Sequence, residues 1–188
     1  SLGEVFQSDN DDTISCRVSH VPEYGNAGYF SRDGKRDWRG ENHSDQEIPL
    51  AHWHQYDPGF MPAGDIYGSG SPTGVAFYEN GALGDKYSGM LLAAEAAHGD
   101  IFAYFPKVAG AGYELKRFSL MARDGAEGSY FRPSDVMVGA EGAIYVADWF
   151  DSGVGGHVTR DNSLSGAIYR IAPKGFKPSG LAELNYES

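Results

Sequence analysis

The chain has 188 residues, of which 26 are glycine, and this length suits one domain or one part of a larger domain. Its 26 acidic and 15 basic residues give a net charge of −11, which argues against nucleic-acid and anionic-membrane partners because both bind basic surfaces. No apolar stretch approaches the ~18 residues of a membrane span. The single cysteine excludes an internal disulfide and a haem-attachment pair.

Short apolar runs bounded by glycine, proline, asparagine or aspartate predict an all-β domain with many short strands. The run Met90–His98 has a helix-forming composition, but it is short and Gly99 follows it. In chain order, the expected strands are Glu4–Gln7, Thr13–Val21, Ile48–Gln55, Gly74–Tyr78, Gly89–Ala94, Ile101–Phe105, Tyr113–Leu120, Pro133–Val138, Ala143–Asp148 and Ala167–Ala172.

The strand pattern repeats within the chain. The segment Ser71–Ala82 resembles Arg132–Ala143, with proline, valine, glycine and alanine at one offset of 61 residues (133 − 72 = 61). After each copy an apolar run ends in an acid, at Glu95 or Asp148, and a Gly-x-Ile-aromatic run follows. A three-strand unit of this kind is typical of a propeller blade.

The first residues carry a further copy of the last element, because Gly3–Phe6 resembles Gly99–Phe102 and Gly166–Tyr169. We therefore expect residues 1–178 to be the C-terminal portion of a β-propeller that begins inside a blade, with residues 179–188 as a tail or linker. This portion would hold about two to three blades, whereas a ring needs about four to eight. The remaining blades would lie on the same or another chain, and a small independent β-sandwich is the alternative fold.

Several motifs resemble a known family. They are Val5–Asp12, Glu23–Tyr29, Ile48–Trp53, Pro62–Asp65, Ser71–Gly74, Phe131–Val136, Gly142–Asp151, Gly155–His157, Arg160–Asp161 and Ile168–Gly175. These segments are similar to the putative membrane-bound dehydrogenase propellers of planctomycetes and verrucomicrobia, which are related to soluble quinoprotein glucose and sorbosone dehydrogenases. The resemblance implies a six-bladed propeller in the periplasm or outside the cell, with pyrroloquinoline quinone and calcium as cofactors. It also implies a c-type cytochrome as electron acceptor.

The densest polar cluster of the sequence follows a predicted strand. Asp148 ends that strand, and Asp151, His157 and Arg160 stand in the glycine-bearing loop after it. Long loops of this kind are often functional, and His157 is a candidate general base with an aspartate to orient it. The structural alternative is that Asp148 accepts backbone N–H bonds while His157 and Arg160 hold the loop in place.

A second candidate base, His20, precedes a Gly-Asn-x-Gly turn, with Glu23 and Asn26 beside it. Related dehydrogenases have a similar turn near the central channel, which makes these three residues candidates for a substrate or cofactor pocket. The alternation of the preceding strand is equally compatible with a buried imidazole that is satisfied by hydrogen bonds. Glu95 ends the equivalent strand of the other repeat copy, and it is a candidate for a second acid at the channel mouth.

Two further segments carry ligand-type residues. His52 and His54 point to one face if their segment is extended, where they could bind a transition metal with Asp57 or Asp65. Alternatively, their rings stack on aromatic residues of a blade. A second group, Asp9, Asp11 and Asp12, offers oxygen ligands of the kind that calcium prefers, although it lacks the twelve-residue EF-hand pattern. A solvated acidic turn is the alternative there.

Three functions remain open at the level of the sequence. The first is a sugar dehydrogenase of the aldose or sorbosone type, with His20 or His157 as the base. The second is a non-catalytic propeller that binds a glycan or a protein through its aromatic, acidic surface. The third is a calcium-dependent lactonase-like hydrolase, which needs several acids around one metal ion.

Overall fold

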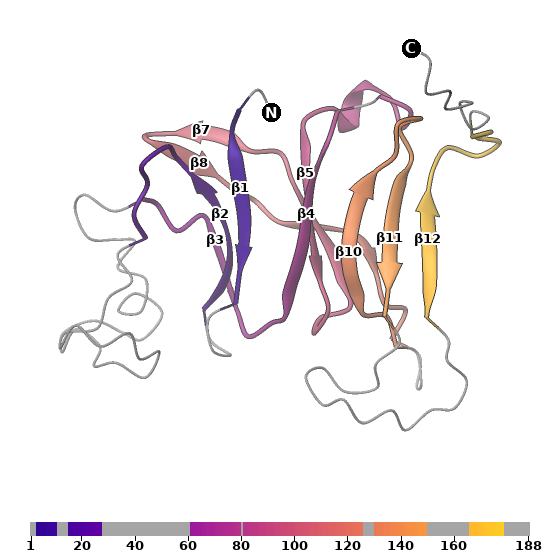
Figure 1. The fold of residues 1–188 in the computed structure, drawn as a ribbon, viewed down its shortest axis with the longest axis horizontal. Coiled ribbons are helices and arrows are strands. Elements are labelled where there is room, and N and C mark those ends of the chain that lie inside the picture. The colour runs from indigo at the N-terminus through magenta and orange to yellow at the C-terminus, as the bar shows by residue number, and fades with distance from the viewer. Residues whose placement is uncertain are drawn as a thin grey trace, which may run out of the picture.

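The computed structural model describes residues 3–10, 15–27, 61–79, 81–125, 130–149 and 166–178. These residues form four antiparallel sheets, so the all-β expectation is confirmed (Figure 1). The elements are β1 (Val5–Asp9), β2 (Cys16–Val21), β3 (Asp65–Gly68), β4 (Pro72–Tyr78), the 3-10 helix η1 (Asp85–Tyr87), β5 (Met90–Glu95), β6 (Asp100–Tyr104), β7 (Lys107–Ala109), β8 (Gly112–Glu114), β9 (Phe118–Ala122), β10 (Pro133–Val138), β11 (Ile144–Asp148) and β12 (Ala167–Ile171).

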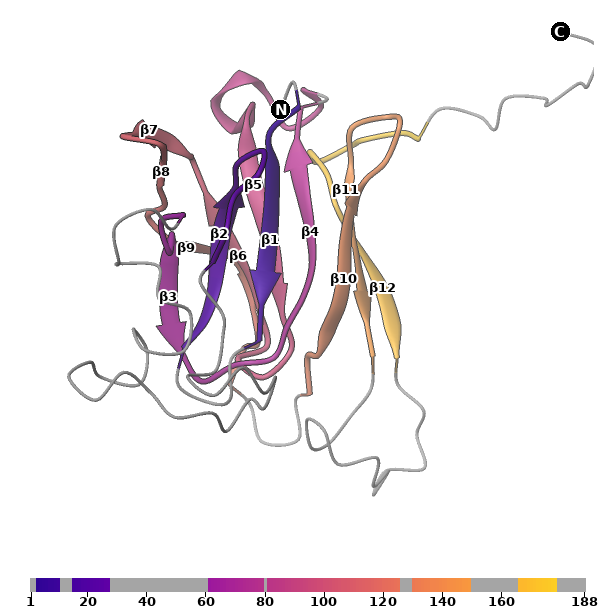
Figure 2. The same ribbon diagram turned by 60° about the vertical axis from the view of Figure 1, so that its left-hand side comes forward.

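Three of the sheets stand side by side in chain order (Figure 2). The first sheet has the strand order β1-β2-β3, the central sheet β4-β5-β6-β9, and the third sheet β10-β11-β12. The fourth is the small hairpin β7-β8. Within the described ranges, no helix is long or apolar enough to cross a bilayer.

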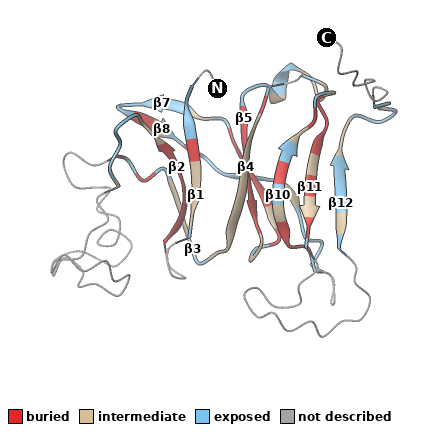
Figure 3. Ribbon diagram, viewed as in Figure 1, coloured by how far each residue is buried: buried red, intermediate tan, exposed pale blue. Residues whose placement is uncertain are grey.

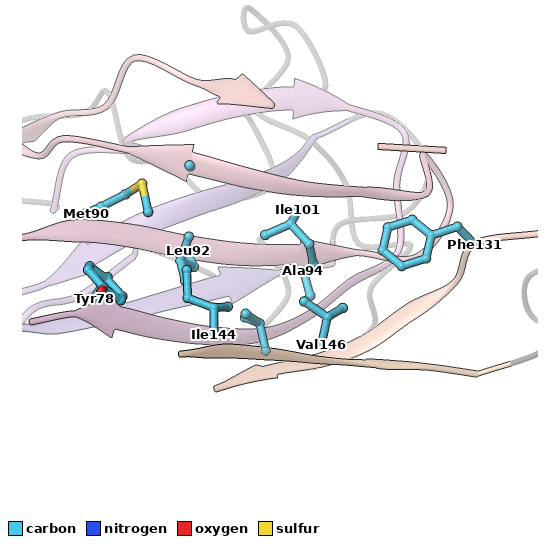
Figure 4. Packing of buried hydrophobic residues seen from close by; sticks show 10 residues of the cluster. Tyr78, Met90, Leu92, Ala94, Ile101, Phe131, Ile144 and Val146 are labelled. Carbon is cyan, nitrogen blue, oxygen red and sulfur yellow. The ribbon is translucent and has the colours of Figure 1, made fainter. Parts of the chain in front are cut away.

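The central sheet is covered on both of its faces. In β5, Leu91 and Ala93 pack with Phe6 and Val18 of the first sheet. The alternate residues of β5 pack instead with the third sheet, and Figure 4 shows Leu92 beside Ile144. Every residue of β5 is therefore buried, as the red colour of Figure 3 shows. This two-sided burial explains why the strand is a continuous apolar run rather than an alternating one.

The repeat detected in the sequence has a structural counterpart. Thr73 and Ser134, which are 61 residues apart (134 − 73 = 61), lie at the same place in β4 and β10. The Oγ1 of Thr73 donates to the carbonyl oxygen of Ala94 at 3.2 Å, and the Oγ of Ser134 donates to that of Ala147 at 3.2 Å. Each hydroxyl thus ties a first strand to the second strand of its own sheet.

The strand predictions differ from the structure at several places. Strands β3 and β7 were not expected, and the predicted strand Tyr113–Leu120 is divided into β8 and β9. Leu115, which lies between β8 and β9, is buried in the core. The predicted strand Ile48–Gln55 lies outside the described residues.

The position of β1 also differs from the prediction. Gly3–Phe6 was expected to be a third-strand copy, but β1 runs in the direction of the second strands β5 and β11, as Figures 1 and 2 show. The end of β1 meets the start of β4, where the Oγ of Ser8 donates to the carbonyl oxygen of Thr73 at 2.6 Å. A glycine precedes both second strands and third strands, so the sequence pattern alone does not distinguish the two.

We predict that Leu91→Ala and Leu92→Ala each lower the free energy of unfolding by about 2–5 kcal/mol, because both side chains are fully buried although they are adjacent. Urea unfolding would measure both. Met137→Ala is the control and should cost less than about 0.5 kcal/mol, since Met137 is 57% exposed. A near-neutral result for either leucine would mean that one face of the central sheet is open.

Candidate functional site

Two of the predicted site acids, Glu95 and Asp148, end the second strands of their sheets and bind backbone N–H groups. The Oε1 of Glu95 accepts from the backbone N–H of Ser71, and its Oε2 accepts from that of His98 at 2.6 Å. The Oδ1 of Asp148 accepts from the backbone N–H of Arg132 at 2.7 Å. Both carboxylates are buried. This is the structural role that the sequence left open for Asp148, and Glu95 shares it.

The residues before β10 extend these contacts to the central sheet. The guanidinium Nη1 of Arg132 donates to the carbonyl oxygens of Ala96 and Ala97 at 3.1 and 3.3 Å. Beside it, the ring of Tyr169 meets that of Phe131 edge-on at 5.7 Å. Burial, followed by the charge of Asp148, raises the pKa of Tyr169. This end of the stack is therefore a network that fixes the third sheet against the central one.

His20, the other predicted base that the structure describes, forms a pair with Glu4. The Nε2 of His20 lies 2.5 Å from the Oε2 of Glu4, while the imidazole packs against the rings of Phe6 and Tyr113 at centroid distances of 5.2 and 4.8 Å. The Nδ1 of His20 is buried and has no hydrogen-bond partner among the described residues. If the proton lies on Nε2 and is donated to Glu4, then Nδ1 carries no proton. Burying this unprotonated nitrogen costs less free energy than burying an N–H group without an acceptor.

The structure does not bring His20 and Asp148 together. His20 is paired with Phe6 near the start of β1, whereas Ser8, near its end, meets Thr73. The Oγ1 of Thr73 donates to the carbonyl oxygen of Pro133, which is paired with Asp148. His20 and the strand-end acids therefore lie toward opposite ends of the stacked sheets, and they cannot share one catalytic centre.

The remaining predicted residues are spread over the chain. Glu23 and Asn26 lie in the exposed turn after β2, where the backbone carbonyl of Asn26 accepts from the N–H of Met61 at 2.9 Å. The Oδ2 of Asp9 accepts from the side-chain amide of Gln7 at 2.6 Å. Outside the described residues lie Asp11, Asp12, His52, His54, Asp57, Asp151, His157 and Arg160. In the part of the chain that the structure describes, no group of three or more His, Cys, Asp or Glu residues is placed to hold a metal ion.

Asp65, a candidate metal ligand in the sequence, belongs to a polar cluster between the first and central sheets. Its Oδ2 accepts from the hydroxyl of Tyr104 at 2.9 Å and lies 3.6 Å from the Nη1 of Arg117. The guanidinium of Arg117 also lies over the rings of Tyr67 and Phe102, at 5.4 and 4.8 Å from their centroids. Burial is the largest cause of the raised pKa values of Tyr67 and Tyr104, and the negative charge of Asp65 contributes to both.

Sequence reasoning missed Glu4, Tyr113 and the Asp65 cluster. Glu4 lies in a repeated strand element and in no catalytic motif, and its relation to His20 depends on the register that pairs Phe6 with His20. No family model matches the chain, and no curated protein is significantly similar to it.

We expect Asp148→Ala to lower the free energy of unfolding by about 1–3 kcal/mol, because it leaves the buried N–H of Arg132 without an acceptor. Asp148→Asn retains a carbonyl oxygen and should restore most of the loss. Asp85→Ala, at an exposed acid of η1, is the matched control. Urea unfolding of the three variants would test this, and equal stability of Asp148→Ala and the wild type would contradict the capping role.

The free energy of unfolding should also fall at alkaline pH. The pKa values of Tyr67 and Tyr104 are raised in the folded chain, so the folded state keeps protons that unfolded tyrosines lose above pH ~10. The free energy of unfolding should therefore decrease above that pH, by about 1.4 kcal/mol per pH unit for each such tyrosine. Tyr104→Phe should lower this slope by one tyrosine's share in denaturant titrations between pH 9 and 12. An unchanged slope would contradict the prediction.

Proposed function

We propose that this chain is part of a β-propeller that oxidises a carbohydrate, and that the Glu4–His20 pair accepts a proton from the substrate hydroxyl. The propeller is supported by three sheets stacked in chain order, and by the repeated hydroxyl contacts of Thr73 and Ser134. The carbohydrate chemistry is supported by the resemblance to sugar dehydrogenase propellers. The single observation that carries the site is the short contact between Glu4 and a buried imidazole.

Within this pair the two residues have different tasks. The side chain of Glu4 is 47% exposed, whereas that of His20 is 9% exposed, so the carboxylate is the group that a substrate can reach. His20 holds the carboxylate through Nε2, and the rings of Phe6 and Tyr113 hold the imidazole. Glu4 is thus the proposed general base, and His20, the base expected from the sequence, is the positioning residue.

The described residues around this pair do not fit pyrroloquinoline quinone. That quinone carries carboxylates, which need cationic partners. The pair instead presents the carboxylate of Glu4. The rings of Phe6 and Tyr113 pack beside the pair and carry no positive charge. No step at this pair is therefore routed through the quinone. Glu4 takes the hydroxyl proton, and the hydride of the same carbon would pass to a redox acceptor of the quinone or dye class that is held away from this pair.

A second function, glycan binding without turnover, is favoured by one observation. Tyr24 follows β2 in the same turn as Glu23 and is 95% exposed, with a φ of 59°. A non-glycine residue with positive φ is uncommon and is found in turns. A tyrosine ring so exposed, close in sequence to His20, is suited to stacking on a sugar ring.

The test is dye-linked oxidation of aldoses by the full-length protein, with quinone and calcium added. Glu4→Gln should lower kcat by about 10²–10⁴, the usual contribution of a general base. Glu114→Gln is the matched control and should leave kcat unchanged, because this exposed glutamate forms a surface pair with Lys116 at 3.2 Å. His20→Gln should lower kcat and change the pH profile.

Two results would contradict the proposal, one for the role of Glu4 and one for the oxidation itself. Full activity in Glu4→Gln would exclude this carboxylate as the base. Dye that stays oxidised with every aldose, together with glycan-array binding that Tyr24→Ala abolishes, would establish the binding function in place of the catalytic one.

A further inference from the structure

Strands β6 and β9 are neighbours in the central sheet, yet a long connection joins them. It holds 13 residues (118 − 104 − 1 = 13), and six of these form the hairpin β7-β8. Two antiparallel neighbours can be joined by about two to five residues. Because connections beyond the needs of the fold often carry binding residues, this hairpin is a candidate for such a role.

The second strand of this hairpin, β8, packs on the first sheet (Figure 1). The ring of Tyr113 meets the imidazole of His20 edge-on, at a centroid distance of 4.8 Å. Next to it, a Cβ atom on Gly112 would lie 3.2 Å from the Cγ of Pro62, so the backbone of β8 fits closely against the residues before β3. The connection from the central sheet therefore delivers Tyr113 to the imidazole of His20.

The fold does not use the hydroxyl of Tyr113. By contrast, the fully buried tyrosines Tyr78 and Tyr104 have hydroxyl partners. The hydroxyl of Tyr78 accepts from the N–H of Leu83 at 2.6 Å, and that of Tyr104 donates to Asp65 at 2.9 Å. The hydroxyl of Tyr113 forms no hydrogen bond with a described residue, and it is not buried. It is therefore a polar group that reaches solvent beside a buried imidazole.

Two accessible polar groups thus flank the imidazole of His20. The carboxylate of Glu4, on a side chain that is 47% exposed, binds Nε2, and the phenol of Tyr113 packs against the ring. Hydroxyl groups on adjacent carbons of a sugar lie close together, so a substrate that gives one hydroxyl proton to Glu4 brings a second hydroxyl to the same place. A neutral phenol both donates and accepts hydrogen bonds, which suits a hydroxyl partner.

We propose that Tyr113 determines specificity at this site by hydrogen bonding the substrate hydroxyl next to the one whose proton Glu4 accepts. The site therefore takes sugars with a vicinal pair of hydroxyls, and in an aldose that is oxidised at C1 the recognised group is the 2-hydroxyl. The inference rests on the proposed function for the place where the sugar binds. Its test measures binding, which does not require oxidation.

The experiment is an NMR titration of the full-length protein with glucose, 2-deoxyglucose and 6-deoxyglucose. Tyr113→Phe keeps the ring against His20 and removes only the hydroxyl. It should raise the Kd for glucose by about 3–10-fold, the usual contribution of one neutral hydrogen bond, and leave that for 2-deoxyglucose unchanged. The wild type should itself bind 2-deoxyglucose more weakly than glucose by the same factor. For 6-deoxyglucose, which retains the 2-hydroxyl, the results should follow those for glucose.

The matched control is Tyr87→Phe, on η1, where phenylalanine retains the contact with Lys86 that lies 4.6 Å from the ring centroid. It should bind all three sugars as the wild type does. An unchanged midpoint of urea unfolding would show that Tyr113→Phe retains the fold. If that variant does not fold, the comparison of glucose with 2-deoxyglucose in the wild type tests the same hydrogen bond without altering the protein.

Three outcomes would overturn the inference. They are equal binding of glucose and 2-deoxyglucose by the wild type, equal weakening of both sugars in Tyr113→Phe, and no saturable binding of glucose. Equal weakening would assign Tyr113 a packing role on His20 alone. Dye that stays oxidised while the expected binding differences appear would contradict the oxidation and support the role of Tyr113. Dye reduction that depends on neither the 2-hydroxyl nor Tyr113 would contradict this inference and leave the oxidation standing.

Discussion

The burial of both faces of the central sheet is the constraint on which the rest of the described structure depends. Leu91 and Leu92 are adjacent, yet each is fully buried, because the first sheet covers one face and the third sheet covers the other. Fully burying one such side chain contributes about 1.5–3 kcal/mol. Neither outer sheet can be removed without exposing half of this core, so the three sheets are mutually dependent.

Stacked sheets leave the polar groups at the strand ends to be satisfied, and the buried acids do this. Glu95 and Asp148 bind the backbone N–H groups that precede β4 and β10, at the ends of their own second strands. An unsatisfied buried N–H would cost about 1–3 kcal/mol at each place. Part of the acid excess of the chain is thus structural, and these two residues are poor candidates for chemistry because backbone donors already occupy their carboxylates.

The candidate functional residues lie at two separate ends of the stacked sheets. The sequence offered His20 and Asp148 as catalytic candidates in two different motifs, and the structure places them toward opposite ends. The pair of Glu4 and His20 combines a half-exposed carboxylate with a buried imidazole, and it is therefore the more suitable place for proton transfer.

The sequence by itself determined the class of fold, most of the strands and the repeat of Ser71–Ala82 in Arg132–Ala143. These features depend on local composition and spacing, which short apolar runs and turn residues express directly. It also offered backbone capping as one of two roles for Asp148. Only the tertiary structure decided that β1 runs in the direction of β5 and β11, that a buried Leu115 lies between β8 and β9, and that Glu4 meets His20. Each of these depends on strand direction, on register or on contacts between sheets, and a one-dimensional pattern does not specify how distant segments pack.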